Sequence, residues 1–361
     1  MRILVCATAA AIALAAHPAP ARADGAGAAF WKSVQAACDA TAVKPASEPA
    51  RRIAQNAIDE FNLFGGHRID ANGRLFHFGV TAAEQDKEDG KHPASTDHAG
   101  WRQVLKYWQA LYGDDAATMT EALGYSGAST ATPPKDGEEL LRPSAADLLH
   151  AADGVSDPDV RETLREASWR AAIVDTPWSA AFISYVVRKA GVAADAFQFS
   201  NAHRAYIYDA FATSAAEVAG KTESHLYRAC PLGATRPRVG DILCNQREPD
   251  LADASDAVVR ERIRGELGAG PDTRTVRSTH CEVVASIDAP ARKMYTIGGN
   301  VLQGVVARKL NLRGHGLKFS AEQKGRCGAG EWTLPQSAVQ AKDADQCSLN
   351  DRKWFVLLQL R

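Results

Sequence analysis

The stretch from Pro177 to Gly191, PWSAAFISYVVRKAG, predicts a helix that is apolar on nearly every side. Thr176 followed by Pro177 is a typical helix start, and Gly191 is a typical helix end. The positive charges of Arg188 and Lys189 lie in the last turn, where they suit the helix dipole. A helix without a wide polar face is stable in water only when other elements enclose it. We therefore expect this helix to be central and buried.

Short strands are predicted after this helix. They are rich in Val, Ile, Leu and aromatic residues and lie at 240–244, 280–288, 293–299 and 353–360. A polar, charged insertion at 245–279 separates the first two strands. Further helices are predicted from apolar periodicity at 47–65, 100–112, 144–153, 157–173 and 203–219, and a hairpin is predicted around the Asp-Ala-Asn-Gly turn at 70–73. Helices first and an antiparallel sheet after them favour an α+β fold.

The N-terminus has the pattern of a secretory signal peptide over residues 1–23. Arg2 precedes an almost wholly apolar run at 3–16, and Ala21–Ala23 forms an A-x-A cleavage site. The apolar run is too short for a membrane span, so we expect an exported periplasmic protein with no membrane span. The rest of the chain is divided into a flexible N-terminal segment, a mainly helical region and a larger domain that holds the insertion, at 24–46, 47–140 and 141–361.

The charge balance of the chain limits its expected partners, and its cysteine content predicts disulfides. The chain has 42 basic and 43 acidic residues, which gives no basic excess for nucleic acid. Six of the seven cysteines lie beyond the signal peptide, and an even number in an oxidising compartment favours disulfides. Cys327 and Cys347 are close enough in sequence to clip a C-terminal loop. No His or Cys spacing indicates a metal, and nothing in the sequence calls for a cofactor.

Ser179 lies in the first turn of the predicted central helix. Backbone N–H groups are free in this turn, so a nucleophile there has donors nearby for a developing oxyanion. The alternative is that Ser179 only makes a local hydrogen bond at a helix start, as serine often does. On this stretch alone the second interpretation is favoured, because single short motifs are weak.

Five motifs follow one another in a fixed order along the chain. They are W-S-A-A-F-I-S at 178–184, A-H-x-x-Y-I at 202–207, G-D-x-x-C at 240–244, H-C-x-x-V at 280–284 and I-G-G-N at 297–300. With these motifs the chain resembles the NlpC/CHAP group of papain-like peptidoglycan hydrolases, and it is more closely similar to the uncharacterised bacterial family catalogued as domain of unknown function 2272. The resemblance covers roughly residues 50–361.

The resemblance implies a papain-like fold, in which the buried helix packs on a small antiparallel sheet, and a catalytic role for three residues. Ser179 takes the place of the usual cysteine nucleophile, His280 takes the place of the general base, and Asn300 takes the place of the residue that orients the imidazole. Asp241 is implied to be structural. Serine ionises less readily than cysteine and needs a well-aligned base, and asparagine gives an imidazolium no charge stabilisation.

Other residues are candidates for lesser roles. The resemblance raises His203 from a surface histidine to a candidate for contact with substrate, and Trp178 is a second such candidate. The implied strands 240–244 and 280–288 are antiparallel neighbours, which would let Cys244 and Cys281 form a disulfide. Cys281 is not expected to be a catalytic thiol, because successive strand residues face opposite sides.

Three functions follow from this reading. The first is an exported hydrolase that cuts an amide or peptide bond of peptidoglycan or its stem peptides. The second is a non-catalytic module that binds the cell wall or a protein in a degenerate cleft. The third is an esterase or acyltransferase, because a serine nucleophile suits esters better than amides. The first ranks slightly above the second, and it rests mostly on analogy of fold.

Overall fold

The computed structural model describes residues 25–69, 75–84, 100–114, 116–123, 145–221, 225–320 and 352–361. The helices in these ranges are α1 (Gly25–Ala42), α2 (Glu48–Leu63), α3 (Gly100–Tyr112), α4 (Ala116–Ala122), α5 (Ala145–Asp153), α6 (Pro158–Asp175), α7 (Ser179–Lys189), α8 (His203–Val218) and α9 (Asp256–Gly265). The strands are β1 (His67–Ile69), β2 (Leu75–His77), β3 (Tyr227–Pro231), β4 (Ile242–Gln246), β5 (Thr279–Asp288), β6 (Lys293–Val301), β7 (Gly304–Arg313), β8 (Lys318–Phe319) and β9 (Trp354–Leu360).

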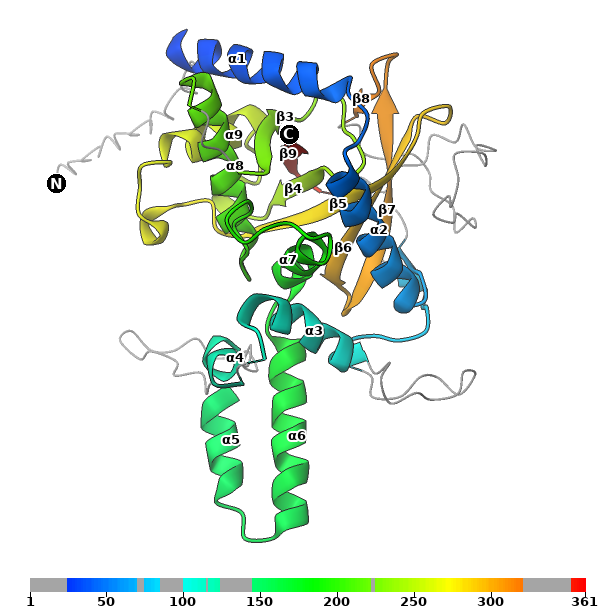
Figure 1. Cartoon of the computed structure of the whole chain (residues 1–361), viewed down its shortest axis with the longest axis vertical. Helices are drawn as coiled ribbons and strands as arrows, with labels where there is room; N and C mark the ends of the chain where they lie inside the picture. Colours follow the sequence, from blue (N-terminus) through cyan, green and yellow to red (C-terminus); the bar gives the residue numbers. More distant parts are fainter. Residues whose placement is uncertain are drawn as a thin grey trace, which may run out of the picture.

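These strands form one mixed sheet with helices packed around it, so the α+β class is confirmed (Figure 1). The strand order is β2-β1-β7-β6-β5-β4-β9-β3, and β8 pairs with β7 outside this path. Neighbouring strands are antiparallel, except for the short parallel contact between β1 and β7. The strand β9 lies inside the sheet, between β4 and β3, although it follows every other described strand in the sequence.

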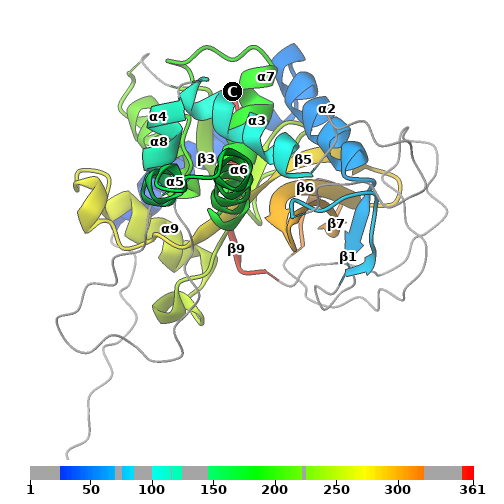
Figure 2. The same cartoon turned by 90° about the horizontal axis from the view of Figure 1, so that it is seen from below.

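The helix α7 is the central helix that the sequence predicts. It packs against α3 on one side and against β5 and β6 on the other (Figure 2). The side chains of Phe182, Ile183, Val186 and Val187 are fully buried. The chain turns back into α8, which packs against β3. As a result, the first residues of α7 and α8 approach each other near the start of β5.

The larger of two apolar core clusters includes residues from both sides of the expected division at residue 140, which itself lies outside the described residues. It extends from Ala50 in α2 to Leu360 in β9, because α2 packs on β5, β6 and β7. The insertion 245–279 is also integrated: its helix α9 buries Val259 and Ile263 and packs on β9. The sequence did not predict this helix, because most of its residues are polar and only one of its faces is apolar.

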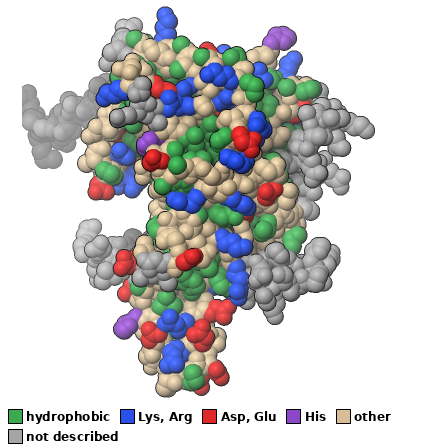
Figure 3. All heavy atoms as spheres, viewed as in Figure 1, with side chains coloured by type: hydrophobic (Ala, Val, Ile, Leu, Met, Phe, Trp, Pro, Cys, Tyr) green, Lys and Arg blue, Asp and Glu red, His purple; other side chains and the backbone are tan. Residues whose placement is uncertain are grey.

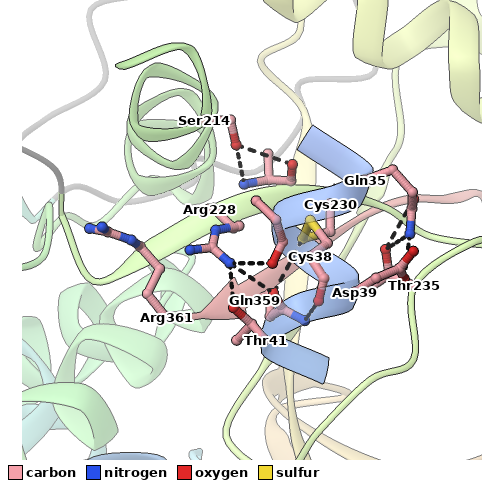
Figure 4. Close-up of a disulfide and its surroundings, with 12 residues drawn as sticks. Gln35, Cys38, Asp39, Thr41, Ser214, Arg228, Cys230, Thr235, Gln359 and Arg361 are labelled. Atoms are coloured by element: carbon pink, nitrogen blue, oxygen red, sulfur yellow. Dashed lines mark hydrogen bonds between the residues drawn. A yellow bond between two sulfur atoms is a disulfide. The ribbon is translucent and has the colours of Figure 1, made fainter. Parts of the chain in front are cut away.

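The segment 24–46, which we expected to be flexible, contains α1. A disulfide joins Cys38 of this helix to Cys230 of β3 (Figure 4). The Arg228 guanidinium donates to the hydroxyl of Thr41 at 2.6 Å, and the Gln359 amide donates to the carbonyl of Cys38 at 3.1 Å. These bonds fasten α1 across the edge strand β3. The Ala-rich sequence carries no clear apolar stripe, so periodicity did not reveal the helix.

A second disulfide joins Cys244 of β4 to Cys281 of β5, which are directly opposite each other in the antiparallel ladder. This is the pairing that the resemblance implied. The expected Cys327–Cys347 clip and the signal peptide at 1–23 lie outside the described residues. No helix in the described ranges is long and apolar enough to cross a membrane.

The helices α5 and α6 form a hairpin that projects away from the sheet (Figure 1). Positive and negative side chains are interspersed over its surface (Figure 3). Arg165 and Asp153 form one ion pair across the hairpin. Asp157 caps α6 by accepting from the backbone N–H groups of Asp159 and Val160. This mixture of charges is typical of a solvated helix surface.

Candidate active site at the start of the central helix

Ser179 is the first residue of α7 and is 8% exposed. Trp178 precedes it at the N-cap and makes no side-chain capping bond. The first intrahelical bond runs from the backbone N–H of Phe182 to the carbonyl of Trp178 at 2.9 Å. The backbone N–H groups of the first turn therefore have no partner within the helix. They also lie at the positive end of the helix dipole, where an oxyanion is stabilised.

The imidazole that contacts Ser179 belongs to His203. The Ser179 Oγ and the His203 Nε2 are 2.7 Å apart, which is a normal hydrogen-bond distance. His203 begins α8, and its Nδ1 is hydrogen-bonded to the hydroxyl of Tyr206, one turn later. In the tautomer protonated at Nδ1, the ring donates to Tyr206 and Nε2 accepts from the Ser179 hydroxyl. This is the arrangement of a general base next to a nucleophile.

The surroundings keep His203 neutral. Burial lowers the pKa of His203 well below its ordinary value of 6.5, and the nearby charges of His280 and Arg247 act in the same direction. Burial also raises the pKa of Tyr206 well above its ordinary value, so the phenol keeps its proton. A neutral imidazole that accepts from a serine hydroxyl is in the protonation state that proton abstraction requires.

His280 does not take the position that the resemblance implied. Neither of its ring nitrogens has a hydrogen-bond partner in the described part of the chain, so it does not contact the Ser179 hydroxyl. Instead, its ring lies edge-on to the ring of His203, with the centroids 5.1 Å apart. His203 thus lies between Ser179 and His280. His203, the first residue of α8, contacts both side chains, Ser179 by its hydrogen bond and His280 by its ring.

Glu282 is a charged residue that the sequence reading missed. It is fully buried, and its carboxylate accepts from the Arg308 guanidinium at 2.7 Å and from the Thr296 hydroxyl at 2.6 Å. Burial raises its pKa, but the Arg308 charge and these bonds outweigh burial and lower it to about 2. Its Oε1 is 3.6 Å from His280 Nε2, beyond hydrogen-bond distance. Alternation along the strand was the available signal, because residues 280 and 282 share a face.

Asn300 does not orient His280, since both His280 nitrogens are unpaired in the described residues. It has a φ of 54°, in the left-handed region that asparagine tolerates better than most residues, next to an irregularity between β6 and β7. Gly298, two residues before Asn300, lies beside the His280 ring, because a Cβ at this position would be 3.0 Å from His280 Nε2. The left-handed backbone conformation of this turn therefore accounts for an asparagine at position 300.

Trp178 is a core residue and does not line an open cleft. Its side chain is fully buried and stacks on Phe64, with the ring centroids 6.2 Å apart. Its Nε1 donates to the Gln303 side chain at 3.3 Å. The helical spacing of aromatic residues at the start of α7 and in α3 therefore reflects packing. In this structure Trp178 exposes no surface with which it could contact a substrate.

Asp241 is structural, as the resemblance implied. It is fully buried and accepts from the backbone N–H groups of Arg238 at 2.7 Å and Leu360 at 2.9 Å. Burial raises its pKa to about 7, although the Arg238 charge and these hydrogen bonds act against that rise. The residue closes the turn that leads into β4 and ties it to the end of β9. The described residues show no contact between Asp241 and Ser179.

The comparisons with known proteins leave the function open and establish the family. No curated protein and no solved structure matches this chain. One family model matches residues 95–360, which is most of the chain and includes Ser179, His203 and His280. The chain belongs to the bacterial family described as "Uncharacterized protein conserved in bacteria (DUF2272)".

Proposed function

We propose that this protein is an exported hydrolase in which Ser179 is the nucleophile and His203 is the general base. The observation that carries the proposal is the 2.7 Å contact between Ser179 Oγ and His203 Nε2 at the start of a buried helix. The placement of the nucleophile at the start of a helix that packs on an antiparallel sheet also supports a papain-like arrangement. In this proposal the base comes from α8, and His280 is its neighbour.

The chemistry would proceed by acyl transfer. The Ser179 hydroxyl gives its proton to His203 Nε2 while its oxygen forms a bond to the substrate carbonyl carbon. The resulting oxyanion is stabilised by N–H groups in the first turn of α7. The leaving group then takes the proton from Nε2 as its bond to carbon breaks. Water then attacks the acyl carbon and gives a proton to Nε2. Nε2 passes this proton to the Ser179 oxygen as the acyl bond breaks, which releases a carboxylic acid and restores the Ser179 hydroxyl.

The hydrogen bond between His203 and Tyr206 affects which substrates the site can cleave. Tyr206 holds the ring through its hydroxyl but is neutral, so it gives the imidazolium less stabilisation than a carboxylate would. Such a site handles esters and activated amides more easily than ordinary peptide bonds. We propose peptidoglycan or its stem peptides as the substrate class, because the motif order resembles that of cell-wall hydrolases. The signal-peptide pattern and the two disulfides support a periplasmic location.

A fluorophosphonate probe, which labels activated serines, tests the nucleophile. We expect the wild-type protein to be labelled at Ser179 and the Ser179→Ala and His203→Gln variants to remain unlabelled. Digestion of purified peptidoglycan by wild type and by Ser179→Ala, followed by mass spectrometry of released fragments, tests the substrate. Wild-type fragments equal to those of the Ser179→Ala control would rule out cell-wall hydrolysis.

A non-catalytic binding module is the second candidate, and one observation favours it. Ser179, His203 and Tyr206 are all more than nine-tenths buried and satisfy one another by hydrogen bonds, as residues of a structural network do. The same experiment separates the two candidates. A module of this kind would bind peptidoglycan in a sedimentation assay, whereas neither wild type nor Ser179→Ala would release fragments or react with the probe.

A further inference from the structure

Three neighbouring strands carry a row of buried polar side chains beside the candidate active site. Asn245 of β4 is opposite His280 of β5 on one side and opposite Trp354 of β9 on the other. The three residues are 1%, 5% and 6% exposed. Residues directly opposite in neighbouring strands place their side chains on the same face of the sheet. The row is therefore continuous across β9, β4 and β5.

The polar atoms of this row have no hydrogen-bond partner in the described part of the chain. They are the Nδ2 and Oδ1 of Asn245, both ring nitrogens of His280 and the Nε1 of Trp354. A buried polar group without a partner destabilises the folded state, and native proteins contain few such groups. Five such atoms on three adjacent residues indicate a place that a polar group from outside the chain occupies.

Arg247 adds a positive charge at the open end of the row. The antiparallel pairing continues past β4, because the Arg247 backbone N–H donates to the Ser278 carbonyl at 2.8 Å. Arg247 is two residues after Asn245, so both side chains are on the same face. Arg247 is exposed, and its guanidinium makes no hydrogen bond within the described residues. Its charge is near enough to lower the pKa of both His203 and His280.

Arg247 forms no ion pair within the described residues. The charge of Glu282 stabilises the Arg247 charge, and those of Arg352 and Arg308 oppose it. The guanidinium of Arg308, which is buried, is bonded to Glu282, and both side chains are 1% exposed. The pKa of His280 is lowered, so its imidazole is neutral and offers one N–H. The row then contains the Trp354 and Asn245 N–H donors and a neutral imidazole, with the Arg247 cation at its open end and the charge of Arg352 nearby. A planar acceptor with a single negative charge fits this set, whereas a dianion would be repelled by the ionised Glu282.

We propose that Asn245, His280, Trp354 and Arg247 form a subsite that binds a carboxylate of a peptide substrate. The proposal rests on the proposed function in that the subsite adjoins Ser179 through the contact between His203 and His280. The substrate class is then a peptide with a free carboxylate near the bond that is cut. The Arg247 guanidinium pairs with the carboxylate, and the Asn245 amide and the Trp354 indole donate to its oxygens.

Binding can be measured without turnover in the Ser179→Ala protein. Isothermal titration calorimetry with N-acetyl-alanyl-alanine, in its L,L and D,D forms, is compared with the same peptides blocked as carboxamides. We expect the free acid of at least one form to bind about tenfold or more tightly than its amide, since hydrogen bonds to charged groups contribute roughly 1.5–3 kcal/mol. Arg247→Gln is expected to weaken the acid to the level of the amide.

Two further variants keep the test decisive. Asn245→Asp preserves the size of the side chain and adds a negative charge, so it is expected to abolish binding of the acid and to retain that of the amide. The matched control, Arg102→Gln, replaces an arginine that lines no cavity in common with the proposed subsite. Arg102 is exposed and lines a separate cavity of about 400 Å³ beside Trp101 and Trp169, and its loss is expected to leave binding unchanged.

Several outcomes overturn the proposal. Equal affinity for acid and amide, or no binding of any peptide, shows that the row holds only water. Loss of binding in Arg102→Gln but not in Arg247→Gln places the ligand in the cavity beside Trp101 and Trp169. Failure of the proposed function is seen separately, because fluorophosphonate labelling of wild-type Ser179 does not depend on peptide binding. Labelling without peptide binding rejects the subsite alone, and binding without labelling rejects catalysis alone.

Discussion

At the scale of single residues, the site depends on which histidine reaches Ser179. Motif order pointed to His280, since a histidine that opens a strand holds this role in the group that the chain resembles. The structure has His203 at 2.7 Å from the hydroxyl, with His280 behind it. The spacing of the two histidines in the sequence could not show which of them contacts Ser179. Their distance from Ser179 depends on where α8 begins over the sheet, and that is decided by packing.

The two histidines are therefore expected to differ in their effect on Ser179. We expect His203→Gln to slow fluorophosphonate labelling by about a hundredfold or more, because general-base catalysis contributes roughly 10²–10⁴-fold. We expect His280→Gln to slow it less than about tenfold, because His280 makes no hydrogen bond to the serine in the described residues. Labelling rates measured under identical conditions check this. A larger effect of His280→Gln would restore the order that the motifs implied.

The pH dependence of labelling follows from the lowered pKa of His203. Burial opposes protonation of this ring, as do the charges of His280 and Arg247. The base form then remains populated below the ordinary histidine pKa of 6.5. We expect the labelling rate to stay level as the pH falls from 8 to 6.5, and to decline only at lower pH. Rates measured in a series of buffers test this, after correction for hydrolysis of the probe. A decline centred above pH 6.5 would contradict a buried, neutral base.

At the scale of elements, the sequence identified most of what surrounds the site. Apolar periodicity and capping residues located α2, α3, α5, α6, α7 and α8 within a few residues, and β4, β5, β6 and β9 followed from their apolar content. The strand β7 was missed because Arg308 and Lys309 interrupt its apolar pattern, yet both are buried. Arg308 can be buried in β7 because its guanidinium pairs with the carboxylate of Glu282, and only the tertiary structure brings these two residues together.

The close approach of α7 to β6 depends on Gly299. A Cβ at this position would be 2.6 Å from the Cβ of Phe182 and 2.9 Å from the Trp178 ring. We expect Gly299→Ala to push the start of α7 away from the sheet, with a loss of about 1–3 kcal/mol in the free energy of unfolding. Labelling of Ser179 should slow at the same time. Urea unfolding and probe kinetics measure the two effects.

Gly316→Ala is the control for this substitution. A Cβ on Gly316 meets only the Lys318 side chain, at 3.6 Å or more, which is ordinary contact. We expect this variant to match wild type in both measurements. A Gly299→Ala protein of wild-type stability and reactivity would show that the contact between α7 and β6 relaxes without cost.

At the scale of the whole molecule, two disulfides hold the sheet and its first helix together. The number of cysteines and the signal-peptide pattern favoured disulfides, and the resemblance implied the Cys244–Cys281 pair. The Cys38–Cys230 pair could not be inferred, because its partners are 192 residues apart in sequence and one lies in a helix that has no clear pattern. Long-range pairing of this kind is a property of the folded chain alone.

The Cys38–Cys230 bond is expected to contribute to stability and not to reactivity. A link across so long a segment restricts the unfolded chain, which corresponds to about 4–5 kcal/mol in the loop-entropy model. We expect the double variant Cys38→Ala, Cys230→Ala to have a lower melting temperature, measured by calorimetry. Its labelling rate at 25 °C should equal that of wild type, since neither cysteine contacts Ser179 or His203. A loss of labelling in the still-folded variant would show that α1 also shapes the site.

The interior position of β9 has a consequence for the order in which the molecule is completed. The strands β4 and β3 precede β9 in the sequence by about a hundred residues, yet each pairs with it and not with the other. While the chain emerges from N- to C-terminus, the sheet stays open at this seam, and Trp354 is missing from its place beside Asn245. A nascent chain therefore cannot assemble the proposed carboxylate subsite before its final described strand is available. If the chain crosses a membrane as an unfolded thread, the subsite is first assembled on the far side.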